Sequence, residues 1–114
     1  MNEDKTRIEH MIEHSQRILT MLHNVSDEQF YNSSTLVDAI SFNFAVLGEA
    51  ASKISAELRE RNSNIPWRTI IGMRNFLIHE YIKINPSYLW ETAQNDLPPL
   101  LQQLEAILNS LKSE

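Results

Sequence analysis

Residues Thr35–Arg61 read TLVDAISFNFAVLGEAASKISAELRER, and this run decides the fold class of the chain. It contains no proline and a single glycine, the two residues that most often interrupt a helix. Apolar side chains recur with a mean spacing of about 3.5 residues, the period of a helix that buries one seam. They are Val37, Ile40, Phe44, Leu47, Ala51, Ile54 and Leu58. We therefore predict one long helix from Thr35 to about Arg61.

A second apolar group lies on the other side of this predicted helix. Phe42, Ala45 and Val46 fall opposite the seam when residues are placed about 100° apart. Such a helix packs on both sides, either within its own domain or against a second copy. Gly48 would let another helix approach closely, which explains a glycine that costs about 1 kcal/mol in a helix interior.

The rest of the chain also carries helix signals, namely three- and four-residue apolar spacing, capping residues and prolines at first turns. The further predicted helices cover residues 2–24, 66–78 and 85–94, with a short helical turn beginning at 26. We expect a kink or a restart at 96–99, after which a helix continues to the C-terminus. Together they predict an all-α, up-and-down bundle of four to five helices. The length of 114 residues suits a single domain spanning 1–114.

Composition narrows the function classes. The absence of cysteine rules out disulfides and thiolate catalysis, and no apolar run approaches the roughly 18 residues of a membrane span. With no leader pattern visible, we interpret the protein as cytoplasmic and not membrane-bound. The net charge of −5 argues against general coating of nucleic acid. Residues 53–83 nevertheless carry +3 and the remainder −8, which indicates either a local basic patch or simply solvated helix faces.

The residues whose side chains could take part in catalysis are concentrated in Met73–Tyr81, which reads MRNFLIHEY. Arg74 is a permanent cation whose planar donors fit phosphate oxygens, and His79 exchanges protons near neutral pH. Asn75 and Tyr81 add an amide and a phenol. This set suits phosphodiester chemistry, although an Arg and a His near a helix end also serve as plain capping residues.

The spacing within this motif limits the geometry. Arg74 and His79 are five residues apart, so on an ideal helix they point about 140° away from each other. Both can address one phosphate only if the helix ends or distorts near His79, or if a second chain completes the site. In either case we expect the Tyr81 hydroxyl to be reachable.

Two other features of the sequence could form sites. His10-Met11-Ile12-Glu13-His14 has the H-x-x-E-H spacing of inverted zinc peptidases. Both histidines lie off the apolar stripe of their helix, so we interpret them as part of a solvent-exposed polar face and predict no metal site. Trp67, Trp90 and Tyr88 are interpreted as core or interface anchors in preference to base-stacking platforms.

Four stretches of the chain resemble the HepT-like toxins of the HEPN superfamily. The Arg-x4-His-x-Tyr motif is one, and its positions show no departure from the family pattern. The other three are Leu47-Gly48-Glu49-Ala50-Ala51, Ile65-Pro66-Trp67-Arg68 leading into Gly72-Met73, and Leu89-Trp90-Glu91-Thr92 followed by Asp96-Leu97-Pro98-Pro99-Leu100. In order and spacing the resemblance covers roughly Leu36 to Leu108.

The resemblance implies a HEPN bundle that forms a homodimer, with two motifs facing one cleft. It also implies a toxin that is a metal-independent endoribonuclease and needs no cofactor. His79 would be the general acid/base, Arg74 would bind the scissile phosphate, and Asn75 would position the substrate. Attack by the ribose 2′-OH would restrict cleavage to RNA.

The resemblance further implies a partner, a minimal nucleotidyltransferase antitoxin that neutralises the toxin by AMP transfer to Tyr81. Two alternatives stay open. One is a non-catalytic HEPN module that binds a nucleotide or the nucleotidyltransferase. The other is a helical interaction protein in which the motif only caps a helix. RNA cleavage that depends on His79 would exclude both.

Overall fold

The computed structural model describes residues 2–114, and the regular elements in this range are all helical. In chain order they are α1 (Asn2–Met21), α2 (Asp27–Tyr31), α3 (Ser34–Ser52), α4 (Ala56–Arg61), α5 (Trp67–His79), η1 (Tyr81–Lys83), α6 (Pro86–Glu91), η2 (Thr92–Asp96) and α7 (Leu97–Lys112). The predicted all-α bundle is confirmed. Within residues 2–114, none of the helices combines the length and the apolar character that crossing a membrane requires.

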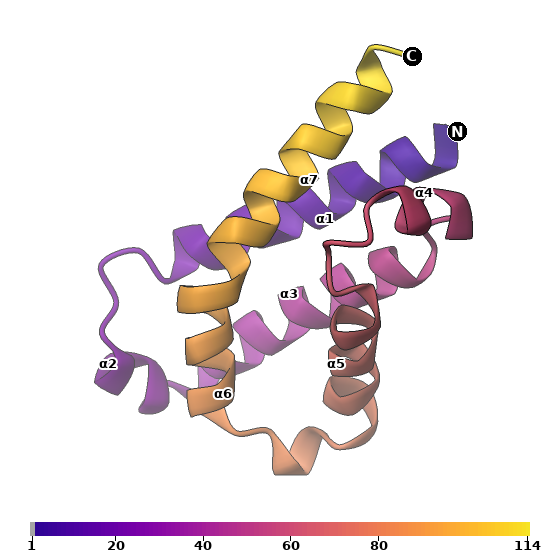
Figure 1. Ribbon diagram of the computed structural model, residues 1–114. Coiled ribbons are helices and arrows are strands. Elements are labelled where there is room, and N and C mark those ends of the chain that lie inside the picture. Colours follow the sequence, from indigo (N-terminus) through magenta and orange to yellow (C-terminus); the bar gives the residue numbers. More distant parts are fainter. Residues whose placement is uncertain (1) are drawn as a thin grey trace.

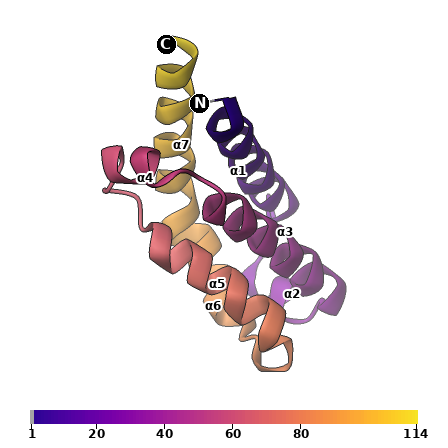
Figure 2. The same ribbon diagram turned by 90° about the vertical axis from the view of Figure 1, so that its right-hand side faces the viewer.

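Helix α3 lies at the centre of the bundle. It packs against α1 and against α5, and α7 runs along α1 so that both ends of the described chain lie at the same end of the molecule (Figure 1). The view turned by 90° shows α1 and α5 on different sides of α3 (Figure 2). The predicted seam residues Ile40, Phe44 and Leu47 are buried in these contacts. The opposite side is not covered throughout, because the Phe42 side chain is 63% exposed.

The prediction of one helix from Thr35 to about Arg61 is wrong at its C-terminal part. Helix α3 ends at Ser52, and a separate helix, α4, begins at Ala56. The seam itself continues across the break, since Ile54 and Leu58 are 2% and 3% exposed. The apolar spacing therefore predicted burial correctly without revealing that the backbone changes course.

Side chains from outside the apolar seam make this break. Ser55 caps α4 by accepting a hydrogen bond from the Leu58 backbone N–H at 3.2 Å. Asp4, at the start of α1 and 4% exposed, accepts from the backbone N–H of Ser55 at 2.9 Å and from its hydroxyl at 2.6 Å. Arg59 donates to the carbonyls of Ile54 and Ser52 at 3.0 and 3.1 Å. These bonds satisfy the free backbone groups that a helix end exposes.

Some of the other predicted helix ends agree with the structure, while the helices predicted over 2–24 and 85–94 both end early, the second at Glu91. Ser26 and Gln29 form the predicted capping box, and Asn85 caps α6 with Pro86 in the first turn. Helix α1 stops at Met21, three residues earlier than predicted, and Asn24 turns the chain with a φ of 60°. The predicted kink before Pro98 takes the form of η2, a segment of wider π-helical turns that joins α6 to α7.

The three aromatic residues interpreted as anchors differ in their surroundings. Trp67 is 7% exposed and donates its indole N–H to the Asn62 carbonyl at 3.0 Å. The half-buried Trp90 packs on Phe30 with ring centroids 5.7 Å apart. Both belong to the core, as predicted. Tyr88 does not, because it projects from α6 into a surface pocket and is 46% exposed.

Candidate active site

Helix α5 carries three of the four motif residues and sets their directions. The helix is continuous from Trp67 to His79, so Arg74 and His79 keep the separation of about 140° around its axis. Asn75 lies between them, about 40° from His79. Tyr81 follows in η1, after a break in the helix at Glu80. The structure brings Arg74 and Asn75 together but does not place Arg74 and His79 on one side of the helix.

Arg74 is the most constrained of the four residues. Its Nη1 donates to the Asn75 Oδ1 atom at 2.8 Å, and its Nε lies 3.0 Å from the Glu49 Oε1 atom of α3. The second approach is a charge pair without hydrogen-bond geometry, since the buried Nε group has no hydrogen-bond partner within residues 2–114. With its side chain 28% exposed, the guanidinium is held at the surface between α3 and Asn75.

Gly48 determines how close Arg74 comes to α3. A Cβ atom at Gly48 would collide with the Cβ of Arg74 and would lie 2.8 Å from the Ile70 carbonyl oxygen. The missing side chain therefore lets α5 lie directly on α3. The close approach predicted for Gly48 is therefore confirmed, whereas the sequence analysis did not assign Glu49 its role as the charge partner of Arg74.

His79 and Tyr81 are exposed at the end of α5. His79 is the last residue of the helix, and its side chain makes no hydrogen bond or ion pair within residues 2–114. Tyr81 is 67% exposed, as expected for a reachable hydroxyl. Neither Arg74 nor His79 hydrogen-bonds a helix carbonyl in the described chain, although His79 lies in the last turn of α5, where a cation would interact favourably with the helix dipole.

One exposed face of α5 carries a stripe that sequence reasoning did not single out. Arg68, Gly72, Asn75 and His79 follow at intervals of four, three and four residues, which places them on one side of a helix. All four are exposed. Arg68 makes no ion pair within residues 2–114. Its spacing from His79 places this unpaired cation on the same face of α5 as the histidine. The spacing alone could have revealed this stripe.

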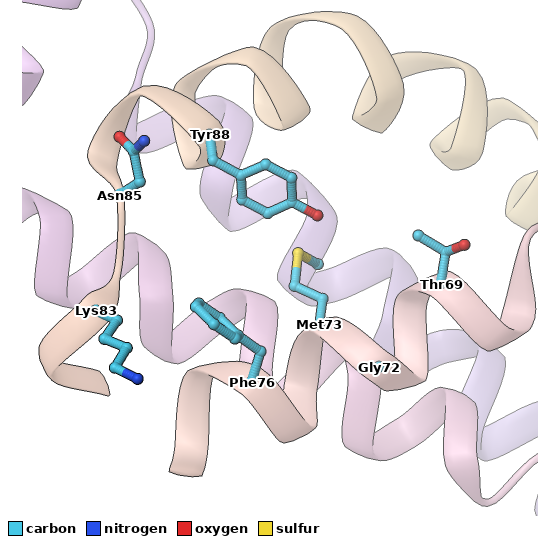
Figure 3. Close-up of a pocket in the computed structure, with 7 residues that line it drawn as sticks. All are labelled: Thr69, Gly72, Met73, Phe76, Lys83, Asn85 and Tyr88. Atoms are coloured by element: carbon cyan, nitrogen blue, oxygen red, sulfur yellow. The ribbon is translucent and has the colours of Figure 1, made fainter. Parts of the chain in front are cut away.

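A pocket of about 400 Å³ opens beside this stripe, between α5 and the segment that leads into α6. Its lining comprises Thr69, Gly72, Met73, Phe76, Lys83, Asn85 and Tyr88 (Figure 3). On the other side of Gly72, a wider open groove of about 660 Å³ includes Arg59, Arg68 and Asn75. Gly72 therefore separates a mainly apolar pocket from a groove that carries two arginines.

The two histidines of α1 do not form a metal site in the structure. Within residues 2–114, no group of three or more His, Asp or Glu side chains is arranged to hold a metal ion. His10 is exposed as predicted, but His14 is half-buried because its Nδ1 lies 2.8 Å from the Oδ1 of the buried Asn43. His14 thus belongs to a contact between α1 and α3, not to a fully solvated face.

Comparison with known proteins identifies the family of this chain. The sequence model of the family described as "Ribonuclease HepT-like" matches residues 11–107. The chain belongs to the HepT-like family of the HEPN superfamily. The resemblance drawn from the Arg-x4-His-x-Tyr motif and its flanking stretches is therefore confirmed.

Several relatives of this HepT-like chain are provisionally named as ribonucleases. A relative in Caldanaerobacter subterraneus subsp. tengcongensis, provisionally named an RNase, is 32% identical over 98% of this chain and 100% of its own. One in Methanocaldococcus jannaschii, named in the same way, is 30% identical over 91% of this chain and 86% of its own. A Thermococcus cleftensis protein, provisionally named ribonuclease HepT, is 34% identical over 54% of this chain and 56% of its own. No solved structure gave a significant match.

Proposed function

We propose that this HepT-like protein is the toxin of a toxin–antitoxin pair and acts as a metal-independent endoribonuclease. The observation that carries the proposal is the state of the motif residues. His79 is exposed and without a partner in the described chain, whereas Arg74 is held in place by Glu49 and Asn75. Phosphodiester cleavage needs a free proton carrier and a fixed cation, and this chain supplies one of each, on different sides of α5.

In the proposed reaction His79 accepts the proton of a ribose 2′-OH. The 2′ oxygen forms a bond to the adjacent phosphorus, and the bond from phosphorus to the 5′ oxygen breaks. The leaving 5′ oxygen takes up a proton from solvent water, and the products are a 2′,3′-cyclic phosphate and a 5′-hydroxyl end. Arg74 stabilises the charge that develops on the phosphate oxygens, and Asn75 positions the strand.

We further propose that the active unit is a homodimer. Within one chain Arg74 and His79 diverge by about 140°, so one phosphate is reached more readily by Arg74 of one copy and His79 of the other. Exposed apolar side chains near Arg74 offer a surface for that contact. Ile78 follows Arg74 by one turn and is 45% exposed, and Phe42, on the Glu49 face of α3, is 63% exposed.

The antitoxin in this proposal is a minimal nucleotidyltransferase that binds the toxin and modifies Tyr81. The Tyr81 oxygen attacks the α-phosphorus of ATP, its proton leaves to solvent, and pyrophosphate departs. The exposure of 67% supports Tyr81 as the acceptor. A bulky anion two residues from His79 would obstruct the phosphate site and attract Arg74, which gives a physical reason for neutralisation.

The test is cleavage of total RNA by purified protein in EDTA, with intact mass showing that Tyr81 is unmodified. The wild type is expected to cut and leave cyclic phosphate ends, and His79→Ala is expected to be inactive. His23→Ala is the matched control, because His23 is an exposed histidine far from the motif in sequence. Absence of cleavage by the unmodified wild type would replace this proposal with the non-catalytic binding module.

A further inference from the structure

The pocket beside α5 has two aromatic walls that the folded chain leaves uncovered. The rings of Phe76 from α5 and Tyr88 from α6 lie on two sides of the pocket, with Met73 between them (Figure 3). Phe76 is 41% and Tyr88 46% exposed, while Met73 is 8% exposed and forms the base. A volume of about 400 Å³ suits a small organic group, since ligand pockets start at about 300 Å³.

Gly72 gives an independent indication that something approaches this pocket from outside. It lies in the interior of α5, where glycine costs about 1 kcal/mol relative to alanine. A Cβ atom there would meet nothing within 4 Å, so the internal packing of the described chain does not require a glycine. An exposed glycine at the edge of a pocket lets a ligand come close to the helix backbone.

The polar groups around the pocket fit an anionic ligand with hydrogen-bonding edges. Lys83 is a wall residue whose side chain is 74% exposed and pairs with Glu80 at 3.8 Å, a surface contact that a phosphate can displace. The Asn85 Oδ1 accepts from the backbone N–H and the hydroxyl of Ser87 at 3.0 and 2.8 Å. Its Nδ2 donor has no partner within residues 2–114 and is left for a ligand.

The proposed catalytic histidine lies about one helical turn along α5 from a wall of the pocket, Phe76. His79 follows Gly72 by seven residues, which places the two within about 20° on the same side of α5. Phe76 precedes His79 by three residues and lies about 60° from it. A ligand between Phe76 and Tyr88 therefore sits about one helical turn from His79.

We propose that this pocket is a nucleobase subsite, in which a base of a single-stranded RNA next to the cleaved phosphate stacks between Phe76 and Tyr88. This inference rests on the proposed ribonuclease function and deepens it. Stacking on aromatic side chains is how proteins hold unpaired bases. Lys83 contacts the phosphate of the bound nucleotide, Asn85 donates to the base edge, and Gly72 lets the strand lie against α5.

The first experiment measures binding separately from cleavage. His79→Ala protein, which leaves RNA intact, is titrated with labelled single-stranded oligoribonucleotides of each base, and anisotropy is recorded. Adding Phe76→Ala or Tyr88→Ala is expected to weaken binding about 10-fold. Tyr31→Ala, which removes a 41% exposed ring from α2, is the matched control and is expected to leave binding unchanged.

Gly72→Ala separates recognition from folding. Because alanine meets no neighbour and favours the helix, this variant is expected to unfold at higher denaturant concentration and yet bind RNA more weakly. A variant that is both more stable and weaker in binding cannot owe its defect to misfolding. Unchanged RNA binding by Gly72→Ala, Phe76→Ala and Tyr88→Ala would overturn the subsite.

The outcomes for the subsite and for the proposed function are distinguishable. If the wild type cleaves RNA but the pocket variants keep the same rate and the same preferred bases, the subsite is wrong and the ribonuclease stands. If the wild type does not cleave but binding still requires Phe76 and Tyr88, the ribonuclease is wrong and the subsite stands. If the pocket variants change only the oligomeric state, the pocket is a contact between copies and the subsite is overturned.

Discussion

Gly48 on α3 lies directly against the Cβ atom of Arg74 on α5. The contact leaves no room for a side chain at Gly48, and the next residue, Glu49, places its carboxylate 3.0 Å from the Arg74 Nε. Gly72 on α5 is the opposite case, because a side chain there would meet nothing. The two glycines of this chain therefore have different explanations. Gly48 is required by the packing of α5 on α3, whereas Gly72 is explained by the approach of a ligand to the surface of α5.

Gly48→Ala is expected to lower the free energy of unfolding by about 1–3 kcal/mol, since overpacking forces α3 and α5 apart. The colliding atoms are the Ile70 carbonyl oxygen and the first side-chain atom of Arg74, and neither can turn away as a flexible side-chain end could. Urea unfolding followed by circular dichroism measures the change. Gly72→Ala is the control, expected to raise stability by about 0.5–1 kcal/mol. Equal destabilisation of both variants would contradict this account of Gly48.

Glu49→Gln is expected to reduce RNA cleavage severalfold while changing stability by less than about 1 kcal/mol. The stability effect is small because the Glu49 side chain is 45% exposed and surface ion pairs contribute little. Cleavage falls because the Arg74 guanidinium loses the charge that orients it, and the loss is expected mainly in kcat. Lys53→Gln is the control, since Lys53 also pairs with Glu49, at 3.8 Å, without touching Arg74. If Glu49→Gln kept the kcat of the wild type, Glu49 would not be needed to orient Arg74 for catalysis.

Asp4→Ala is expected to destabilise the fold by about 1.5–3 kcal/mol, the range for hydrogen bonds to a charged group. The variant leaves the backbone N–H and hydroxyl of Ser55 without their acceptor at the break between α3 and α4. Thermal unfolding is the measurement, with the exposed Asp27 replaced by alanine for comparison. A melting temperature equal to that of the wild type would show that Asp4 does not secure this junction.

The same junction shows how far sequence reasoning reaches into the fold. Apolar spacing located the buried seam on both sides of the break, because hydrophobic burial follows local periodicity. It could not locate the break, because Asp4 reaches Ser55 from a position 51 residues away in sequence. The capping box at Ser26 was predictable because both of its partners lie within four consecutive residues.

The site divides in the same way. Arg74, Asn75, His79 and Tyr81 were identified from the motif, and the angle between Arg74 and His79 followed from their spacing. The contact of Arg74 with Gly48 and Glu49 needed the packing of α3 on α5, which no local pattern encodes. The pocket between Phe76 and Tyr88 depends on the path of η1 and on the placement of α6, so the sequence alone does not reveal that Tyr88 forms a pocket wall.

Tyr81→Phe is expected to abolish AMP transfer when the protein is incubated with its nucleotidyltransferase partner and ATP. The wild type should gain one adenylyl group and lose RNA cleavage, because the new anion lies near His79 and Arg74. Intact mass spectrometry reads the modification, and Tyr88→Phe is the control, since Tyr88 is also exposed, at 46%. If the Tyr81→Phe variant still gained an adenylyl group, another residue would be the acceptor and this assignment would be wrong.

Mixing two inactive variants tests whether one cleavage site is built from two copies. Arg74→Ala and His79→Ala chains are each expected to be inactive alone. If a site takes Arg74 from one copy and His79 from the other, a mixed dimer contains one intact site and one that lacks both residues. Random mixing makes about half of the dimers mixed, so about one quarter of the wild-type activity should return.

A site built within one chain predicts the opposite result. Every chain in the mixture then lacks either Arg74 or His79, and no activity returns at any mixing ratio. Co-refolding the two variants, with size-exclusion chromatography to verify exchange of subunits, makes the absence of recovery informative. Recovery near one quarter would show that the angle of about 140° on α5 is resolved across two chains and not by distortion of the helix.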